Sequence, residues 1–294
     1  MKSGFVGLIG RPNVGKSTLM NAIIGSKIAI TSDKPQTTRN IIEGIYNDDE
    51  CQIVFVDTPG IHKPNHKLGK CLNRQAYYSM DDADILLMLT DASDFFGAGD
   101  KYIIEKLKEV KKPVFLILNK IDKIPKEKIL LKIDEYKDLY NFDEIIPVSA
   151  LTNLNIDTVL ETCKKYLTDN IKYFEDNMIT NKSNEFLISE MIREKIFNLT
   201  DEEVPHSITC KIEKIEKGKN SYNIIGTIIV DRDALKKIII GKKGAMIKQI
   251  GSLARKDIEN LLRSRVYLDL TVKTIKKWRD KDKYLSEFGY NDFE

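Results

Sequence analysis

The sequence has few of the residues on which disulfide-rich, metal-binding and membrane proteins depend. Its 294 residues include four cysteines, three histidines and one tryptophan. The cysteines lie far apart without a CxxC pair, so we expect reduced thiols in a cytoplasmic protein. No apolar run approaches the roughly 20 residues of a membrane helix. The opening MKSGFVGLIG leads directly into a motif, so we expect no signal peptide.

The charge is unevenly distributed, although the net charge is only +3. Residues 205–279 hold 18 Lys and Arg against 7 Asp and Glu, a balance of +11, which leaves −8 for the rest of the chain. A basic segment joined to an acidic one indicates a polyanion-binding module, although a solvated lysine-rich face would give the same count. The length exceeds that of one typical domain and predicts two.

The first half alternates short apolar runs with amphipathic stretches. This pattern predicts an α/β domain with a mainly parallel sheet covered by helices on both faces. Residues 41–47 are expected to pair with the second strand as an antiparallel edge hairpin. The expected strands are 4–9, 52–57, 84–91, 113–118 and 144–148, and the expected helices lie near 15–25, 66–80, 99–110, 126–139 and 153–168.

The second half follows a polar stretch at 169–183 that contains no periodic pattern. A short GKKG segment separates two expected helices, and the tail from Lys276 to Glu294 is polar with scattered aromatics. We therefore predict a smaller α+β domain with helices at 184–199, 233–240 and 244–263 and strands at 207–217, 221–231 and 265–273.

A phosphate-binding motif stands between the first strand and the first helix. Gly10-Arg-Pro-Asn-Val-Gly15-Lys16-Ser17 matches GxxxxGK[ST]. Its glycines let backbone N–H groups turn toward phosphates, and the helix N-terminus adds its positive dipole. Lys16 is expected to reach the β- and γ-phosphates, and Ser17 offers a hydroxyl to Mg²⁺.

A second motif, Asp57-Thr-Pro-Gly60, follows the next apolar strand. An Asp at this strand end suits Mg²⁺, contacted directly or through water. The Gly60 N–H can bind the γ-phosphate and swing away when that phosphate leaves. DxxG alone is a weak signal, but it follows the first motif at a spacing that strengthens both.

The base-binding motif, Asn119-Lys-Ile-Asp122, follows the strand PVFLIL. The Asp122 carboxylate can accept both N1–H and the exocyclic amino group of guanine. Adenine lacks this donor pair, so the motif selects GTP over ATP. Ser149-Ala150 then follows the next strand, where a backbone N–H can meet guanine O6.

The loop Gln36-Thr-Thr-Arg39 is the fifth element. A threonine here can ligate Mg²⁺ through its hydroxyl and contact the γ-phosphate through its backbone. We choose Thr38 over Thr37 because it directly precedes Arg39.

Hydrolysis is predicted to proceed without the glutamine that many small GTPases place directly after DxxG. Ile61 occupies that position, so slow intrinsic turnover is expected. Related GTPases with Asn at the place of Asn13 use it to help hold a monovalent cation beside the phosphates, so the resemblance to them implies K⁺ here, although Asn13 could instead only stabilise the loop. His62 and His66 follow Ile61, and we interpret them as solvated rather than catalytic.

The motifs GRPNVGKSTLMNAIIG, ITSDKPQTTRN, FVDTPGIHKP, LNKID and PVSA, followed by IIIGKKGAMIKQIG, together resemble the bacterial Era family over essentially the whole chain. This resemblance implies a P-loop GTPase domain at 1–170, a linker at 171–184, and a type II KH-like RNA-binding domain with a C-terminal tail at 185–294. It also implies Mg²⁺ as cofactor, with GTP or GDP as ligand and K⁺ as a candidate second cation.

The same resemblance implies that the chain binds 16S ribosomal RNA near its 3′ end and assists 30S subunit assembly. We expect a monomer in the cytoplasm that does not bind DNA, with weak association at the inner face of the cell membrane as a further candidate. A rival hypothesis is a GTP-dependent assembly or membrane-surface module whose basic domain meets acidic partners. A third is a plain hydrolase with a structural tail.

The RNA site is expected at the GKKG loop, because a KH domain clamps the backbone of about four nucleotides with its GxxG loop. Nearby apolar side chains could form a floor for bases or belong to the core, and we favour the core for Ile239, Ile240, Met246, Ile247 and Ile250. Arg255, Lys256, Arg263 and Arg265 either extend the basic surface or are solvated. The predicted RNA-binding residues are Ile240, Gly241, Lys242, Lys243, Gly244 and Lys248.

The predicted GTPase site combines these motifs. The catalytic residues are Lys16, Thr38 and Gly60, and the Mg²⁺ ligands are Ser17, Thr38 and Asp57. The predicted GTP-binding residues are Gly10, Arg11, Pro12, Asn13, Val14, Gly15, Lys16, Ser17, Thr18, Asp57, Thr58, Pro59, Gly60, Ile61, Asn119, Lys120, Ile121, Asp122, Ser149 and Ala150.

Overall fold

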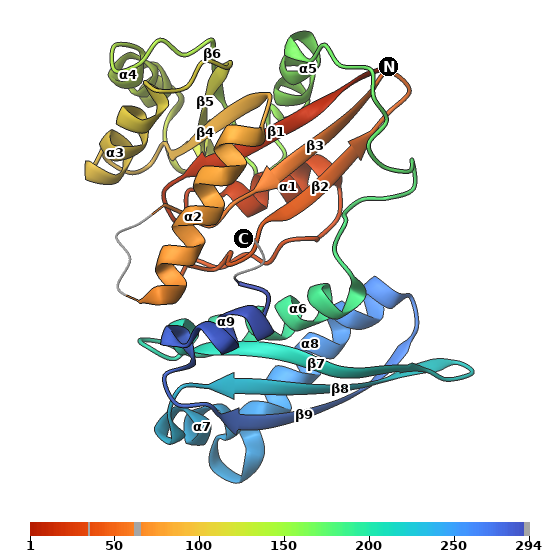
Figure 1. The fold of residues 1–294 in the computed structure, drawn as a ribbon. Coiled ribbons are helices and arrows are strands. Elements are labelled where there is room, and N and C mark those ends of the chain that lie inside the picture. The colour runs from red at the N-terminus through yellow and green to blue at the C-terminus, as the bar shows by residue number, and fades with distance from the viewer. Residues whose placement is uncertain (35, 62–65, 291–294) are drawn as a thin grey trace. The chain divides into compact units, whose positions relative to one another are not determined.

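The computed structural model describes residues 1–34, 36–61 and 66–290. It divides into two compact units (Figure 1). The first unit comprises the described residues of Met1–Thr31, Thr38–Pro64 and Gly69–Asn181, and the second comprises those of Ser32–Thr37, Asn65–Leu68 and Lys182–Glu294. Each unit has its own hydrophobic core, which confirms the predicted combination of two folds.

The first unit is built on a six-stranded sheet of order β2-β3-β1-β4-β5-β6. Every neighbouring pair is parallel except the edge hairpin of β2 and β3, as the sequence predicted. The strands are near-continuous apolar runs because both faces of the sheet are covered. They are β1 (Lys2–Gly10), β2 (Ile42–Asn47), β3 (Cys51–Asp57), β4 (Ile85–Asp91), β5 (Val114–Asn119) and β6 (Glu144–Pro147).

Helices cover both faces of this sheet. α2, α3 and α4 share a core with alternate residues of β4 and β5, whereas α1 and α5 pack against each other and against β1 (Figure 1). The helices are α1 (Lys16–Ile24), α2 (Lys67–Asp82), α3 (Ala98–Leu107), α4 (Lys126–Lys137) and α5 (Ile156–Tyr166). No helix within the described ranges is long and apolar enough to cross a bilayer.

The segment after α5 remains attached to the first unit. Ser3 N–H donates to Asp169 O at 2.7 Å, and Ile45 N–H donates to Ile179 O at 3.0 Å. The fully buried Gln52 accepts the N–H groups of residues 173 and 174 with its side-chain oxygen. Most of the stretch interpreted as a linker, 171–184, is therefore held against β1, β2 and β3, because these backbone groups find partners along the sheet.

The second unit packs helices against a three-stranded sheet of order β7-β8-β9, in which β8 is antiparallel to β7 and parallel to β9. Ser183 caps the first helix by accepting the Phe186 N–H with its hydroxyl at 3.3 Å. The elements are α6 (Asn184–Leu199), β7 (Ile208–Lys217), β8 (Ser221–Val230), α7 (Asp233–Ile240), α8 (Ala245–Leu262), β9 (Arg265–Thr274) and α9 (Asp282–Glu287).

The tail after β9 contains buried aromatic and apolar side chains, although it has no periodic pattern in the sequence. Trp278 and Leu285 are fully buried, and Tyr290 is 2% exposed. The Trp278 Nε1–H donates to Ser207 O at 3.1 Å, which satisfies its one polar group. Aromatic residues scattered through a polar tail thus add buried apolar surface, and Trp278 packs against Phe288 and Tyr290.

Candidate functional site

The predicted nucleotide motifs meet at one edge of the first sheet. The parallel register pairs Leu8 with Asp57 and Asp91 with Asn119, so the carboxyl ends of β1, β3, β4 and β5 lie together. Ligands of open α/β sheets bind at this edge because the strand-to-helix loops gather there.

The carbonyls of the phosphate-binding loop are bonded by side chains. Lys120 Nζ donates to Asn13 O at 2.7 Å and also pairs with Asp91 at 2.7 Å. Asn119 Nδ2 donates to Val14 O at 2.8 Å. Carbonyls that are engaged in this way cannot turn toward an anion, so the loop presents N–H groups instead.

Gly15 is required by this packing. Its φ is +101°, and a Cβ built on it would lie 2.2 Å from Asn119 Nδ2. Any side chain here would displace the amide that holds the loop, which gives the second glycine of the motif a steric reason beyond backbone freedom.

The three predicted Mg²⁺ ligands lie together. Ser17 Oγ donates to Asp57 Oδ2 at 2.6 Å and lies 2.8 Å from Thr38 Oγ1. Thr37 differs, because its hydroxyl donates to Lys34 O at 2.6 Å. Thr38, the predicted ligand, thus lies beside the Ser17 and Asp57 side chains, whereas the Thr37 hydroxyl is bonded to a backbone carbonyl.

The charges at this end of the site are buried. Burial lowers the pKa of Lys16 to about 8, although the Asp57 carboxylate acts in the opposite direction. Burial also raises the pKa of Asp57, opposed by Lys16 and the Ser17 hydroxyl. Within the described ranges, Asp57 Oδ1 is buried without a hydrogen-bond partner. An orphaned carboxylate oxygen beside two hydroxyls is a donor set that suits Mg²⁺.

The base-binding end is held by side chains from two loops. Ser149 Oγ donates to Asp122 Oδ1 at 2.5 Å, so Oδ2 and the second lone pair of Oδ1 remain available to a base. Asn119 Oδ1 accepts the Ala150 N–H at 3.0 Å. Asn119 therefore joins the phosphate-binding loop to the loop after β6, and Ser149 holds one oxygen of Asp122.

The residues of the DxxG segment and the isoleucine that follows it are held by packing and by a hydrogen bond to β1. Ile61 is 6% exposed and belongs to the core of α2, α3 and β4, so its side chain cannot reach an attacking water. A Cβ on Gly60 would lie 2.8 Å from Pro12 N, so this glycine rests directly on the phosphate-binding loop. Thr58 donates its hydroxyl to Leu8 O at 2.8 Å and has a structural role. His62 lies outside the described residues, and His66 is exposed.

In the second unit, the GKKG segment forms a sharp exposed loop between α7 and α8. Gly241 and Gly244 have φ of +72° and +79°, and Lys242 and Lys243 are exposed. A Cβ on Gly241 would lie 2.7 Å from Met246 Cβ, so only glycine allows this approach. Two lysines on a tight loop with accessible backbone make a clamp that suits a phosphodiester.

The apolar residues around this loop divide as their burial dictates. Ile239 and Ile250 are fully buried and belong to the core. Ile240, Met246 and Ile247 are half-buried, so part of each side chain is accessible, and Lys248 is exposed. Two of the five apolar residues thus belong to the core, and the other three keep part of their surface accessible beside the loop.

Protein-family models match parts of both units. A family model described as "50S ribosome-binding GTPase" matches residues 5–120, and one described as "KH domain" matches residues 203–279. The chain is 50% identical to GTPase Era of Clostridium kluyveri over 291 residues, which is 99% of each chain. The chain belongs to the Era family of GTPases.

Two solved Era structures share the whole fold. One is a variant of Aquifex aeolicus Era bound to GDP·AlF₄⁻, and the other is Era in complex with MgGDPNP and nucleotides 1506–1542 of 16S ribosomal RNA. Each has a TM-score of 0.96, with 43% identity over 99% of both chains. The similarity therefore extends through both units and includes the C-terminal tail.

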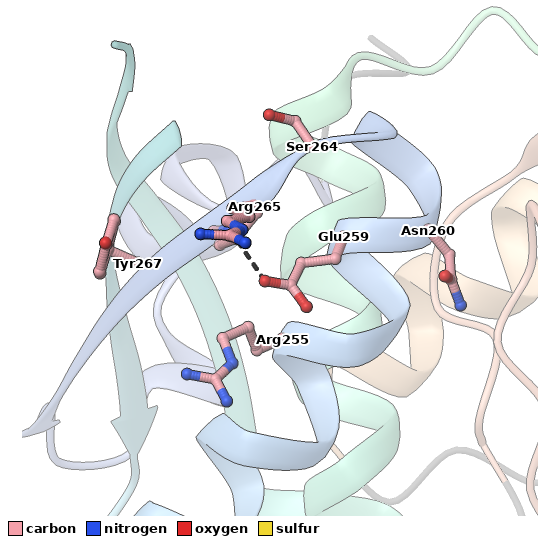
Figure 2. A pocket seen from close by; sticks show the side chains of 7 residues that line it. Arg255, Glu259, Asn260, Ser264, Arg265 and Tyr267 are labelled. Atoms are coloured by element: carbon pink, nitrogen blue, oxygen red, sulfur yellow. Dashed lines mark hydrogen bonds between the residues drawn. The ribbon is translucent and has the colours of Figure 1, made fainter. Parts of the chain in front are cut away.

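In this Era-family chain, the four basic residues that follow the GKKG loop lie in two different surroundings. Arg255 and Arg265 line a hollow of about 500 Å³ between the end of α8 and the start of β9, with Tyr267 beside them (Figure 2). Glu259 Oε1 accepts the Val266 N–H at 3.0 Å, which fixes the carboxylate to the strand. Lys256 and Arg263 are exposed and do not line this hollow.

The sequence did not predict two features of the α8 and β9 region, namely the packing of Gly251 against β9 and the exposure of Tyr267 on that strand. Gly251 on α8 faces Leu270 of β9, with a Cβ position 3.6 Å from Leu270 Cδ1. Leu268 and Leu270 are half-buried on the edge strand, and Tyr267 is 66% exposed. The period-two alternation of β9 is the signal that could have found them, because it places one row of the strand beside α8.

Proposed function

We propose that this chain is a GTP-binding and GTP-hydrolysing switch that binds small-subunit ribosomal RNA near its 3′ end and assists 30S subunit assembly. The observation that carries the proposal is a chain whose first unit brings the Ser17 and Thr38 hydroxyls beside Asp57 and holds Asp122 by Ser149, and whose second unit exposes the GKKG loop. Era in complex with MgGDPNP and a 16S fragment, at 43% identity over the full length, supports the same pairing of ligands.

Mg²⁺ fits the donors present. Ser17 and Thr38 would offer hydroxyl oxygens and Asp57 would offer its orphaned Oδ1. When bound, the ion would neutralise charge on the β- and γ-phosphate oxygens. Lys16 adds a second positive charge, and phosphates would favour its protonated form where burial alone opposes it.

Hydrolysis in this site rests on charge and position. Ile61 is packed in the core and supplies no proton acceptor, so the attacking water must be held by other groups. Loss of the γ-phosphate would remove the partner expected for the Gly60 N–H, and the switch hypothesis is that RNA binding by the GKKG loop differs between the two nucleotide states. Such a site suits slow turnover that a bound partner accelerates.

We expect K⁺ to accelerate GTP hydrolysis relative to Na⁺. Asn13 is an exposed residue of the phosphate-binding loop with φ of +65°, so its side chain can approach a cation beside the phosphates. Phosphate release would be measured at equal ionic strength in the two salts, for the wild type and for Asn13→Ala. We expect the wild type to hydrolyse GTP about tenfold faster in K⁺ than in Na⁺, which corresponds to about 1.4 kcal/mol of transition-state stabilisation from one contact. Asn13→Ala is expected to abolish this difference. Equal rates in both salts would exclude the cation.

The RNA part of the proposal is tested by cross-linking the full chain to total RNA in the GTP-analogue and GDP states. Adducts are expected near the 3′ end of small-subunit ribosomal RNA, attached to peptides that contain Gly241–Gly244. The rival function, in which the basic unit meets acidic proteins or membrane headgroups, predicts adducts without position preference. Vesicles with and without anionic lipid measure that alternative directly, and binding only to the anionic vesicles would favour it.

A further inference from the structure

Arg11 is the second residue of the phosphate-binding loop, but its side chain turns toward α3. Its Nε–H donates to Asp100 Oδ1 at 2.9 Å, and a second guanidinium nitrogen donates to Asp94 Oδ2 at 2.9 Å. Asp100 is fully buried, whereas the Asp94 side chain is 53% exposed. One fork of N–H donors thus joins the loop to a buried and to an exposed carboxylate, an arrangement that only arginine provides.

The surroundings of Asp100 are shaped for this contact. Its other oxygen accepts the Gly97 N–H at 3.0 Å at the start of α3. A Cβ on Gly99 would lie 2.7 Å from Arg11 Cδ, so a glycine keeps open the path of the guanidinium. Burial raises the pKa of Asp100, and the Gly97 N–H and the Arg11 charge act against that effect. The carboxylate is therefore paired from both sides inside the protein.

The backbone of Arg11 also belongs to the loop that must receive phosphates. Its carbonyl accepts Lys16 Nζ at 3.0 Å, and the next residue, Pro12, supports Gly60. We propose that Arg11 is a positioning residue that holds the loop in its phosphate-accepting shape before nucleotide arrives, with buried Asp100 as its anchor. This inference rests on the proposed function, since it concerns the same nucleotide site.

The consequence is a specific kinetic effect. If release of the anchor lets the loop occupy other shapes, only the competent fraction binds, and the apparent affinity falls by that fraction. The association rate constant falls with it, because nucleotide must wait for the competent shape. The dissociation rate constant changes little, because bound phosphates themselves hold the loop. A residue that contacted the nucleotide directly would instead raise the dissociation rate.

The test compares association and dissociation of a fluorescent GDP analogue by stopped flow. Arg11→Met alone would leave a buried carboxylate without its cation, so Asp100→Asn accompanies it. The paired variant is expected to associate about tenfold more slowly, with dissociation changed less than about twofold. Arg11→Lys restores a charge beside Asp100 without the fork and is expected to lose less. Lys108→Met is the matched control, because among the described residues the Lys108 ammonium pairs only with exposed Glu105, one turn earlier at the end of α3.

Wild-type association in the folded paired variant would overturn the inference, and so would a loss confined to dissociation. If the paired variant does not fold, Arg11→Lys carries the test, and an unchanged association rate there overturns it as well. A reduction of the same size in Lys108→Met would mean that any lost cation near α3 acts alike. Absence of saturable GDP binding by the wild type is a different result, which would contradict the proposed function itself.

Discussion

Asp122→Asn is expected to convert the chain from a guanine to a xanthine nucleotide binder. The carboxylate can accept two donors from guanine, whereas an asparagine amide sets its own donor against the exocyclic amino group. Xanthine carries a carbonyl at that position, which the amide N–H can meet. We expect GTP affinity to fall by about two to three orders of magnitude, the cost of a lost charged pair of hydrogen bonds. Affinity for xanthosine triphosphate should rise to a similar degree.

The measurement is competition of GTP and xanthosine triphosphate against a fluorescent nucleotide. Ser149 can still donate its hydroxyl to the asparagine oxygen, so the loop keeps the bond that positions residue 122. Asp134→Asn, on the exposed surface of α4, makes the same chemical change away from the site and should alter neither affinity. Guanine preference that survived Asp122→Asn would mean that another group reads the base.

Lys242→Asp with Lys243→Asp is expected to abolish most RNA binding while GTP hydrolysis without RNA continues. The change reverses two exposed charges on the GKKG loop. Lys243 has a φ of +51°, and aspartate tolerates this region better than most residues, so the loop should keep its shape. We expect affinity to fall at least about a hundredfold at moderate salt. The logarithmic salt slope should decrease by about 1.4, or 0.7 for each lost phosphate of a single strand.

Filter binding or fluorescence anisotropy over a salt series measures both quantities. Lys126→Asp with Lys128→Asp gives the same charge change on exposed α4 of the first unit and should weaken RNA binding much less. Affinity that survived in the GKKG variant would place the RNA elsewhere on the basic unit. Equal losses in the two variants would indicate a general effect of net charge rather than a clamp.

The sequence predicted the elements whose signals are local. Four of the five nucleotide motifs stand at the end of an apolar strand, so strand-to-helix alternation places Gly10, Asp57 and Asn119 at one edge of the sheet. The antiparallel edge hairpin and the helix–strand order of the second unit follow from the same kind of pattern. The alternation of apolar and polar residues and the turn-forming residues between segments were sufficient here, because these features span only a few residues.

Contacts between distant segments could not be predicted in this way. Arg11 lies 83 and 89 residues from its two carboxylates, and no periodicity links them. Trp278 and Tyr290 belong to a segment that is polar on average, so their burial depends on the cavity that other elements leave. The roles of Asn119 and Gly15 likewise emerge only when the amide is seen against the loop.

The segment at 169–181 determines how far a stable fragment of the first unit must extend. It pairs with the outer strand β2 through Ile45 and Ile179 and with Gln52 through residues 173 and 174. Proteolysis before residue 169 would uncover the N–H and C=O groups along that strand, which are a template for intermolecular β-pairing. An isolated GTPase fragment should therefore remain monodisperse only if it retains the chain through Asn181, even though the last nucleotide motif ends some thirty residues earlier.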